Sequence, residues 1–233
     1  MRLHGVRLPR ALQMLGNGEL YPSRSGQPAR PPGRERGRRE EAATLWAAAV
    51  PVYGTLAEAY LRSRGVTVAL PDSLRFAHLP LGRRPLMPAL VAAVSTLEGE
   101  VCGIQRTFLR ANPVGKADLP GGKAKFSLGQ VLGGAVRLGP AARSLIVTEG
   151  LEDGLTLNQQ LGRPVWVAAG AGMLPAMRLP DLVEAVVIGA DNDDAGTLAA
   201  QKAADAFASA GKRVRIMRPS AGYKDFNDQL QGA

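Results

Sequence analysis

The sequence predicts an α/β protein in which residues 143–233 form a parallel sheet flanked by helices, preceded by a smaller α+β module. Beyond Arg143, short apolar runs alternate with helical segments, which is the order of elements that builds a parallel sheet. These runs are continuous, without two-residue alternation, which indicates strands that are buried on both faces. Between residues 74 and 138, short β-prone runs are instead separated by Gly and Pro, which is typical of strands joined by turns.

Residues 1–39 are predicted to form a basic, largely disordered N-terminal segment. Within it, residues 22–39 carry no apolar side chain larger than that of Ala29, so burial cannot offset the entropy lost on ordering. A short amphipathic stretch with leucines at helical spacing precedes this linker.

Residues 40–142 are predicted to form the α+β module. Apolar residues recur at helical spacing in two segments, and strand-like runs follow, two of which flank the hairpin signal Glu98-Gly99-Glu100. We expect helices at 40–50 and 55–64, packed together as a helical hairpin, and strands at 89–95, 101–109, 124–128 and 135–138. The segment 110–125 is expected to be a flexible loop that carries a cluster of cations.

The alternation of strands and helices extends from residue 143 nearly to the end of the chain. We expect strands at 144–148, 165–168, 185–190 and 213–217, helices at about 151–161 and 194–210, and a helical turn near 173–177. Gly211 separates the long Ala-rich helix from the last strand.

The charge balance favours a polyanionic partner. Lys and Arg outnumber Asp and Glu by 29 to 20, which gives a net charge of +9 and an isoelectric point near 10.3. The acids that are present gather around one candidate site. This distribution favours nucleic acid as the partner over a merely solvated basic surface.

Cys102 is the single cysteine of the 233 residues, so an internal disulfide and a cysteine-based zinc site made by this chain alone are excluded. We therefore expect a cytoplasmic protein in which Cys102 is a small apolar side chain in a strand. No stretch approaches the roughly 18 uninterrupted apolar residues of a membrane helix, so no membrane association is expected.

Acidic residues follow two of the predicted buried strands. Glu149 comes directly after strand 144–148, and Asp191 and Asp193 follow strand 185–190. Because ligands of an open parallel sheet collect at the carboxyl ends of its strands, we expect these carboxylates to face one site. Close carboxylates resist simultaneous ionisation unless a divalent cation compensates, which predicts a Mg²⁺ site, with Mn²⁺ as an alternative and without zinc.

Helix capping is the second interpretation of these acids. Asp193 or Asp194 can cap the helix that begins near Ala195, and Glu149 can lie in the first turn of its own helix. Capping explains one acid for each helix, but it explains poorly why two strands both end in acid. We therefore propose Asp191 and Asp193 as the metal ligands and expect Asp194 to be a capping residue or a residue that supports the metal ligands.

Other phosphate-binding motifs are absent or incomplete. The Walker pattern does not occur, and the glycine-rich stretch 168–172 lacks the full dinucleotide fingerprint. The two histidines, His4 and His78, show no partner pattern for catalysis or metal binding.

A further acidic cluster lies near the C-terminus, where Lys224 precedes Asp225 and Asp228. In the simpler interpretation Asp225 only caps the last helix. In the functional interpretation, which we favour, Asp225 or Asp228 helps to hold a second cation, while Lys224 neutralises a phosphate.

Three acidic motifs together carry a family resemblance: Glu149-Gly150 with Asp153 further on, Asp191-Asn-Asp193-Asp-Ala-Gly196, and Lys224-Asp225-Phe-Asn-Asp228. This set resembles the Toprim domain, and within that family the Toprim primases of phages, plasmids and integrative elements, in which the module often precedes a helicase. The stretches 54–65, 70–76 and 103–109 resemble the segment that precedes Toprim in those proteins.

The resemblance implies a Toprim-like sheet over residues 143–233, behind a primase-type module. It implies that Glu149 is a general acid/base and that Asp191 and Asp193 bind Mg²⁺. Supporting acids in the family match Asp153, Asp225 and Asp228, and Glu149 and Asp225 complete the expected metal ligands. The implied activity is Mg²⁺-dependent synthesis of RNA primers on single-stranded DNA, in a protein of a mobile genetic element.

Ribonucleotides, single-stranded DNA and a replicative helicase are the partners that this resemblance implies. We expect the cations of the central module to contact template or nucleotide phosphates: Arg106, Lys116, Lys123 and Lys125. Primases of this group commonly begin with a zinc ribbon, for which this chain has too few cysteines. The missing zinc ribbon keeps a non-catalytic nucleic-acid-binding protein as one alternative. A Toprim-type metal-dependent nuclease, which would use the same acids for phosphodiester cleavage, is the other.

Overall fold

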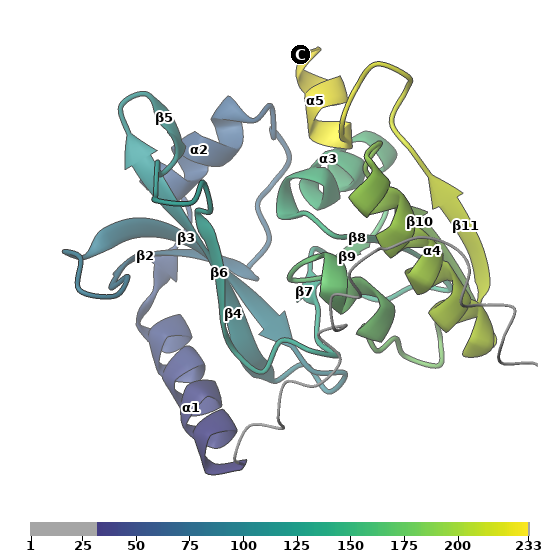
Figure 1. Cartoon of the computed structure of the whole chain (residues 1–233), viewed down its shortest axis with the longest axis horizontal. Coiled ribbons are helices and arrows are strands. Elements are labelled where there is room, and N and C mark those ends of the chain that lie inside the picture. The colour runs from purple at the N-terminus through teal and green to yellow at the C-terminus, as the bar shows by residue number, and fades with distance from the viewer. Residues whose placement is uncertain (1–31, 233) are drawn as a thin grey trace, which may run out of the picture. The chain divides into compact units, whose positions relative to one another are not determined.

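Two β-sheets, one antiparallel and one mostly parallel, organise the chain (Figure 1). The computed structural model describes residues 32–232, which lie within one compact unit. No helix among these described residues is long and apolar enough to cross a membrane.

The first sheet is antiparallel and is built from the N-terminal half of the described chain. Its strands run in the order β1-β2-β3-β4-β5, and β6 also pairs with β4. This half of the chain contains the helices α1 (Pro32–Ala48) and α2 (Leu56–Ser63). The strands of the sheet are β1 (Val50–Pro51), β2 (Leu74–Leu79), β3 (Met87–Ser95), β4 (Val101–Ala111), β5 (Val114–Lys116) and β6 (Lys125–Gly129). The predicted hairpin of β3 and β4 is confirmed, whereas the cationic loop contains the short strand β5.

The second sheet has the strand order β11-β10-β8-β9-β7, and every pair is parallel except β7 with β9. Its elements are β7 (Val136–Arg137), β8 (Ser144–Thr148), α3 (Leu151–Leu161), β9 (Val165–Val167), the 3₁₀ helix η1 (Ala171–Ala176), β10 (Ala185–Gly189), α4 (Asp194–Ser209), β11 (Arg213–Met217) and α5 (Phe226–Gln231). The predicted parallel sheet is confirmed, with each strand and helix close to its expected bounds.

Burial on both faces explains the continuous apolar runs of this sheet. Leu145 and Val147 pack in the core beneath α4, whereas Ile146 faces the core that contains α3. This second core also includes Leu61 of α2 and Leu90 of β3, so one hydrophobic core joins the first sheet to the second. Apolar burial of this kind is the main force that holds the two sheets together.

The start of α1 corrects a prediction. Residues 32–39 are helical, although the sequence predicted disorder there, and the part of the prediction that concerns residues 1–31 lies outside the described chain. Proline is well tolerated at the first helical position, and Arg36 pairs with Glu40 at 3.0 Å one turn later. Because Ala42 is anchored in the core beneath the first sheet, the helix extends N-terminally from a fixed segment.

The predicted helical hairpin of α1 and α2 is wrong. Ala42 of α1 packs with Ile104 and Phe108 on one face of the first sheet, whereas Leu61 of α2 packs with Leu90 on the other. Alternate side chains of a strand point to opposite faces, so the two helices cover different faces.

The strand β7 lies in the stretch predicted to belong to the first module, yet it pairs with β9 of the second sheet. Ser95 at the end of β3 also bridges to Ala135 directly before β7. The two modules therefore exchange backbone hydrogen bonds at their junction, and the predicted division at residue 142 falls after this shared strand.

Candidate active site

The acid-bearing ends of β8 and β10 lie side by side. These strands pair in parallel, with Gly189 of β10 opposite Thr148 of β8. Glu149 directly follows β8, and Asp191 follows β10 after the buried Ala190. The structure therefore brings together two of the loops that the sequence selected.

Close packing at this edge requires glycine. A Cβ atom at Gly196 would lie 2.8 Å from the Cβ of Asp191, inside normal contact distance. A Cβ atom at Gly189 would likewise lie 2.8 Å from Cδ1 of Leu157. The absence of these side chains lets Asp191 lie against the first turn of α4.

Neighbouring negative charges act on Asp191. Burial raises its pKa, and the carboxylates of Glu149, Asp225 and Asp193 raise it further, to about 6. The ammonium group of Lys224 opposes this rise only in part. Because charges interact at this strength only over short distances, four acids from three different loops share one region of the structure.

Asp153 belongs to the same group. It lies in the first turn of α3, and burial together with the charges of Asp225 and Asp191 raises its pKa to about 7. Its Oδ1 accepts a hydrogen bond of 3.0 Å from the backbone N–H of Asn227 in α5. We call these five acids the carboxylate cluster: Glu149, Asp153, Asp191, Asp193 and Asp225.

Two members of the carboxylate cluster also cap helices. Asp193 is the N-cap of α4, and its Oδ1 accepts from the N–H of Gly196 at 2.7 Å. Asp225 is the N-cap of α5 and accepts from the N–H of Asp228 at 2.8 Å. Of the two candidates for the cap of α4, the structure confirms Asp193 and excludes Asp194, which lies inside the first turn of this helix. Each cap uses one carboxylate oxygen and leaves the other for a further partner.

The donor set of the carboxylate cluster fits a hard divalent cation. It consists only of carboxylate oxygens, and the pKa values of Asp153 and Asp191 are raised by burial and by the neighbouring carboxylates, both of which a bound cation would offset. Within residues 32–232, however, no three His, Cys, Asp or Glu side chains are gathered closely enough to form a ready coordination group. The acids of the cluster thus influence one another's charge, but their side chains are not close enough together to bind one ion in this conformation.

Glu152, one residue before Asp153, has a carboxylate with three polar partners. Its Oε1 accepts a hydrogen bond of 2.6 Å from the hydroxyl of Tyr60, and Lys116 lies 3.0 Å from the same oxygen. Its Oε2 accepts a hydrogen bond of 2.7 Å from Lys125. These partners come from α2, β5 and β6, so three elements of the first module meet one carboxylate of α3.

Electrostatics keep Glu152 ionised. Burial would raise its pKa, but the ammonium groups of Lys125 and Lys116 outweigh that effect and hold the pKa well below its usual range. The burial of Tyr60 and the nearby negative charge of Glu152 raise the pKa of the Tyr60 hydroxyl, which stays a proton donor. Since two lysines face one glutamate, this group carries a net positive charge next to the carboxylate cluster.

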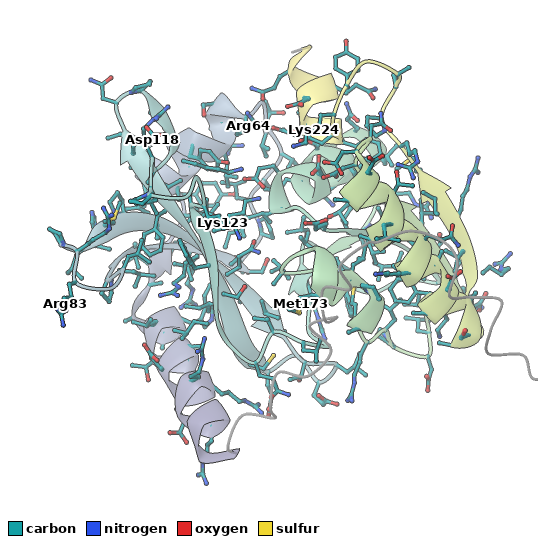
Figure 2. The ribbon with its side chains drawn as sticks, viewed as in Figure 1. Arg64, Arg83, Asp118, Lys123, Met173 and Lys224 are labelled. Carbon is teal, nitrogen blue, oxygen red and sulfur yellow. The ribbon has the colours of Figure 1, made fainter. Side chains whose placement is uncertain are left out.

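The remaining predicted site residues, three cations and the acid Asp228, are placed differently. Lys224 lies 4.0 Å from Asp193, and Asp228 lies 3.8 Å from Arg64. Lys123 is exposed on the loop before β6 (Figure 2). Arg106 is not brought to the cluster, because it lies on the face of β4 that α1 covers, with its guanidinium 5.9 Å from the Phe108 ring.

Two hollows adjoin the charged groups. One, of 490 Å³, is lined by Tyr60, Arg64, Arg110 and Lys116 among others. The second, of 780 Å³, is lined by Asn192, Arg218, Tyr223 and Lys224 among others. Arg218 also donates a hydrogen bond of 2.8 Å to the carbonyl oxygen of Asp191. The first hollow therefore presents Lys116, the partner of Glu152, and the second presents Arg218 and Lys224, which lie next to Asp191 and Asp193.

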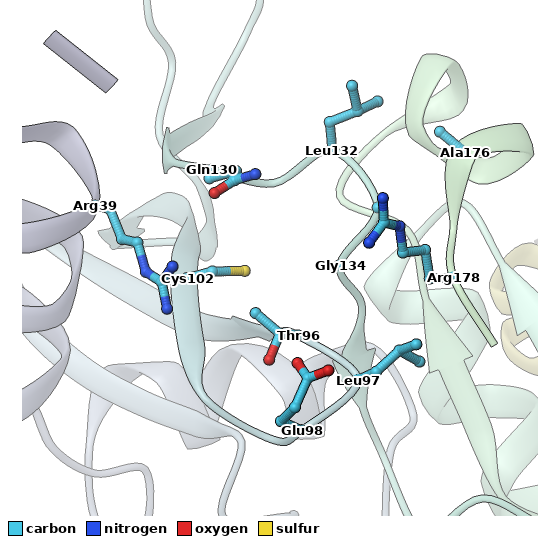
Figure 3. Close-up of a pocket in the computed structure, with 11 residues that line it drawn as sticks. Arg39, Thr96, Leu97, Glu98, Cys102, Gln130, Leu132, Gly134, Ala176 and Arg178 are labelled. Carbon is cyan, nitrogen blue, oxygen red and sulfur yellow. The ribbon is translucent and has the colours of Figure 1, made fainter. Parts of the chain in front are cut away.

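A third hollow, of 460 Å³, is lined by Thr96, Gln130 and Leu132 among others (Figure 3). Arg39 and Arg178 lie on opposite walls, with Cys102 between them. Cys102 is buried, with 3% of its surface exposed, and its thiol donates to the carbonyl of Val94. Burial raises the pKa of this thiol, so Cys102 is the small core side chain that the sequence predicted.

Sequence reasoning missed Glu152, Tyr60 and Asn227. Tyr60 and Glu152 are separated by 92 positions in the chain, and no local pattern joins them. Asn227 donates to the carbonyl of Arg64 and to the hydroxyl of Thr156 through its side-chain amide. The available signal was the presence of two acids, Glu152 and Asp153, within an otherwise buried first helical turn.

Two protein families match consecutive parts of the chain. The Toprim domain family matches residues 144–233. A domain family of unknown function, DUF7146, matches residues 36–138. A search of curated proteins finds no match to the chain.

Solved structures of primase fragments share the fold. The DnaG primase catalytic domain bound to single-stranded DNA is 16% identical, with a TM-score of 0.57 over 86% of this chain and 78% of that one. A DNA primase domain from Pseudomonas aeruginosa is 17% identical, with a TM-score of 0.56 over 83% and 74% of the two chains. The primase fragment of the bacteriophage T7 primase-helicase is 19% identical, with a TM-score of 0.51 over 79% and 75%.

The matching stretch begins at β8 and contains the parallel strands whose ends carry Glu149 and Asp191. The structural matches extend over most of the first module as well. Residues 144–233 of this chain therefore form a Toprim domain, and most of the chain has the fold of bacterial and phage primase catalytic fragments.

Proposed function

We propose that the protein is a primase-like nucleotidyltransferase, which joins ribonucleotides into RNA primers on single-stranded DNA. The observation that carries this proposal is the juxtaposition of mutually repelling carboxylates at the ends of β8 and β10 with the lysines held by Glu152. Phosphoryl transfer needs such an arrangement, because developing negative charge must be balanced while the reacting groups are aligned.

In the proposed reaction, the 3′-hydroxyl of the growing primer attacks the α-phosphorus of a ribonucleoside triphosphate. A new phosphodiester bond forms, the bond to the pyrophosphate leaving group breaks, and Glu149 accepts the hydroxyl proton as general base. Asp191 and Asp193, with Glu149 and Asp225 nearby, would hold Mg²⁺, which would supply Lewis-acid stabilisation of the charge on the phosphoryl oxygens.

Lys116 and Lys125 give the site its affinity for phosphates in this proposal. The net positive charge of their group with Glu152 faces the region of Asp153, whose charge acts on Lys125. Arg64, Arg110 and Lys224 add further cations along the adjoining hollows. A nucleic-acid strand bound there should dissociate as the salt concentration rises. The reason is that contacts to its phosphates release the salt counterions that surround the free strand, and this release becomes less favourable at high salt.

A primer-synthesis assay tests the proposal. Purified protein, Mg²⁺, a single-stranded template and labelled ribonucleotides should yield short RNA products, and Asp191→Asn should remove them. Product formation that survives Asp191→Asn would contradict the assignment of the site. Shortening of a labelled strand without nucleotide-dependent extension would instead identify a Toprim-type nuclease, and DNA binding that survives the substitution without any turnover would identify a binding protein.

A further inference from the structure

Glu152 links the first module to the Toprim domain through buried polar contacts. Its side chain is 7% exposed and accepts hydrogen bonds from Tyr60 at 2.6 Å and Lys125 at 2.7 Å, with Lys116 at 3.0 Å. All three partners are distant in sequence, so this single carboxylate fixes three elements at one point of α3.

The two lysines keep capacity for a further partner. Their side chains remain 41% exposed for Lys116 and 34% exposed for Lys125, whereas Glu152 is enclosed. An ammonium group has three N–H donors, and the ion pair with Glu152 does not use all of them. Their exposed donors therefore remain available to phosphate oxygens.

Holding two lysines in place has an energetic consequence for binding. A long side chain that is free in solution loses rotamer freedom when it engages a phosphate, and two like charges also repel each other. A carboxylate between them removes both obstacles before the ligand arrives. Glu152 thus preorganises its lysine partners, even though its own charge repels phosphate.

We propose that Glu152 is a positioning residue, which acts through Lys116 and Lys125 and holds their ammonium groups for contact with the phosphates of nucleotide and template. This inference rests on the proposed function, because it assigns a role within the same site. It concerns the binding of polyanions, so it can be measured without turnover.

The direction in which one substitution changes the binding affinity distinguishes a positioning role of Glu152 from a purely electrostatic one. Glu152→Gln removes a negative charge, so a purely electrostatic role predicts tighter binding of a polyanion. Positioning predicts weaker binding, by about 5- to 100-fold, because two lysines must then be ordered on association. Glu184→Gln is the matched control, since it makes the same charge change at an exposed ion pair with Arg143. Glu184 precedes β10, at the end of the strand away from Asp191.

The experiment is fluorescence polarisation of a labelled single-stranded oligonucleotide with the full chain and Mg²⁺. We expect Glu152→Gln to weaken binding and Glu184→Gln to leave it unchanged. In a Lys116→Gln, Lys125→Gln background, Glu152→Gln should have no further effect. Unchanged or tighter oligonucleotide binding by a folded Glu152→Gln variant would overturn the inference. It would also be overturned if Glu152→Gln weakened binding by the same factor in the protein that lacks both lysines as in the wild type.

Tyr60→Phe supplies a second variant, which removes only the hydroxyl donor to Glu152 and changes no charge. It should also weaken binding, but by a smaller factor than Glu152→Gln. If Glu152→Gln does not fold, Tyr60→Phe takes its place in the test, and unchanged binding by this variant would refute the positioning role. Failure of the wild type to make primers would overturn the proposed function alone, because the binding measurement is independent of turnover. Primer synthesis whose nucleotide KM is the same in wild type and Glu152→Gln would overturn the positioning role alone.

Discussion

Replacing Asp191 by Asn removes one negative charge from the carboxylate cluster and should stabilise the metal-free protein. Asn has nearly the same shape as Asp, but it carries no charge that is costly to bury or that repels Glu149, Asp193 and Asp225. The same change removes an oxygen with full negative charge from the proposed metal site. Greater stability without Mg²⁺ should therefore accompany lost activity, as is common where an active site gathers like charges.

The structure sets the magnitude. The rise in the pKa of Asp191 from 3.8 to about 6 corresponds to about 3 kcal/mol of unfavourable free energy at neutral pH, at about 1.4 kcal/mol for each pKa unit. Partial exposure to water reduces this to about 1–2 kcal/mol. For a chain of this size, that corresponds to a rise of about 2–8 °C in Tm.

The pH dependence follows from the direction of this pKa shift. Because the pKa of Asp191 is higher in the folded protein than in the unfolded chain, its ionised form destabilises the fold. The advantage of Asp191→Asn is therefore complete above about pH 7 and shrinks as the pH falls through about 6 towards 4. Comparing the variant with wild type at each pH removes the contributions of the other acids.

Thermal unfolding in EDTA at pH 7.5 and pH 4.5 measures this effect, and a titration with Mg²⁺ completes the test. Mg²⁺ should raise the Tm of wild type more than that of Asp191→Asn, because a ligand stabilises the state that binds it. Asp205→Asn is the control, since Asp205 is exposed on α4 and should change stability by less than about 0.5 kcal/mol. An Asp191→Asn variant no more stable than wild type at pH 7.5 in EDTA would show that the charge of Asp191 does not destabilise the metal-free protein.

Two further substitutions test particular contacts. Asp193→Ala should destabilise the protein by about 1 kcal/mol through loss of the α4 cap, whereas Asp193→Ser should retain the cap. Both should abolish primer synthesis; an active Asp193→Ser variant would show that Asp193 only caps. Gly154→Ala should cost about 1–3 kcal/mol in urea unfolding, because its Cβ would lie 2.5 Å from Cγ2 of Val167, and unchanged stability would contradict the close packing of α3 on β9.

Much of the Toprim domain could be predicted because its signals are local. A continuous apolar run gave the bounds of β8, and both the strand Arg213–Met217 and the helix Leu151–Leu161 were expected over the same residues. The order of these elements then implied a parallel sheet, in which Glu149 and Asp191 follow neighbouring strands. The beginning of α1 was not predictable in this way, because its stability comes from packing of its later turns on the first sheet.

The α/β order of the C-terminal part, the acids at its strand ends, their possible use as helix caps and the basic character of the chain all follow from the amino-acid sequence. Packing between elements was needed to show that the charge of Asp225 acts on Asp153 and Asp191 and that Arg106 faces α1. It also decided that Tyr60, Lys116 and Lys125 meet at Glu152. The reason is physical: periodicity records which face of an element is buried, whereas a polar contact across 92 positions depends on how separate elements pack against each other.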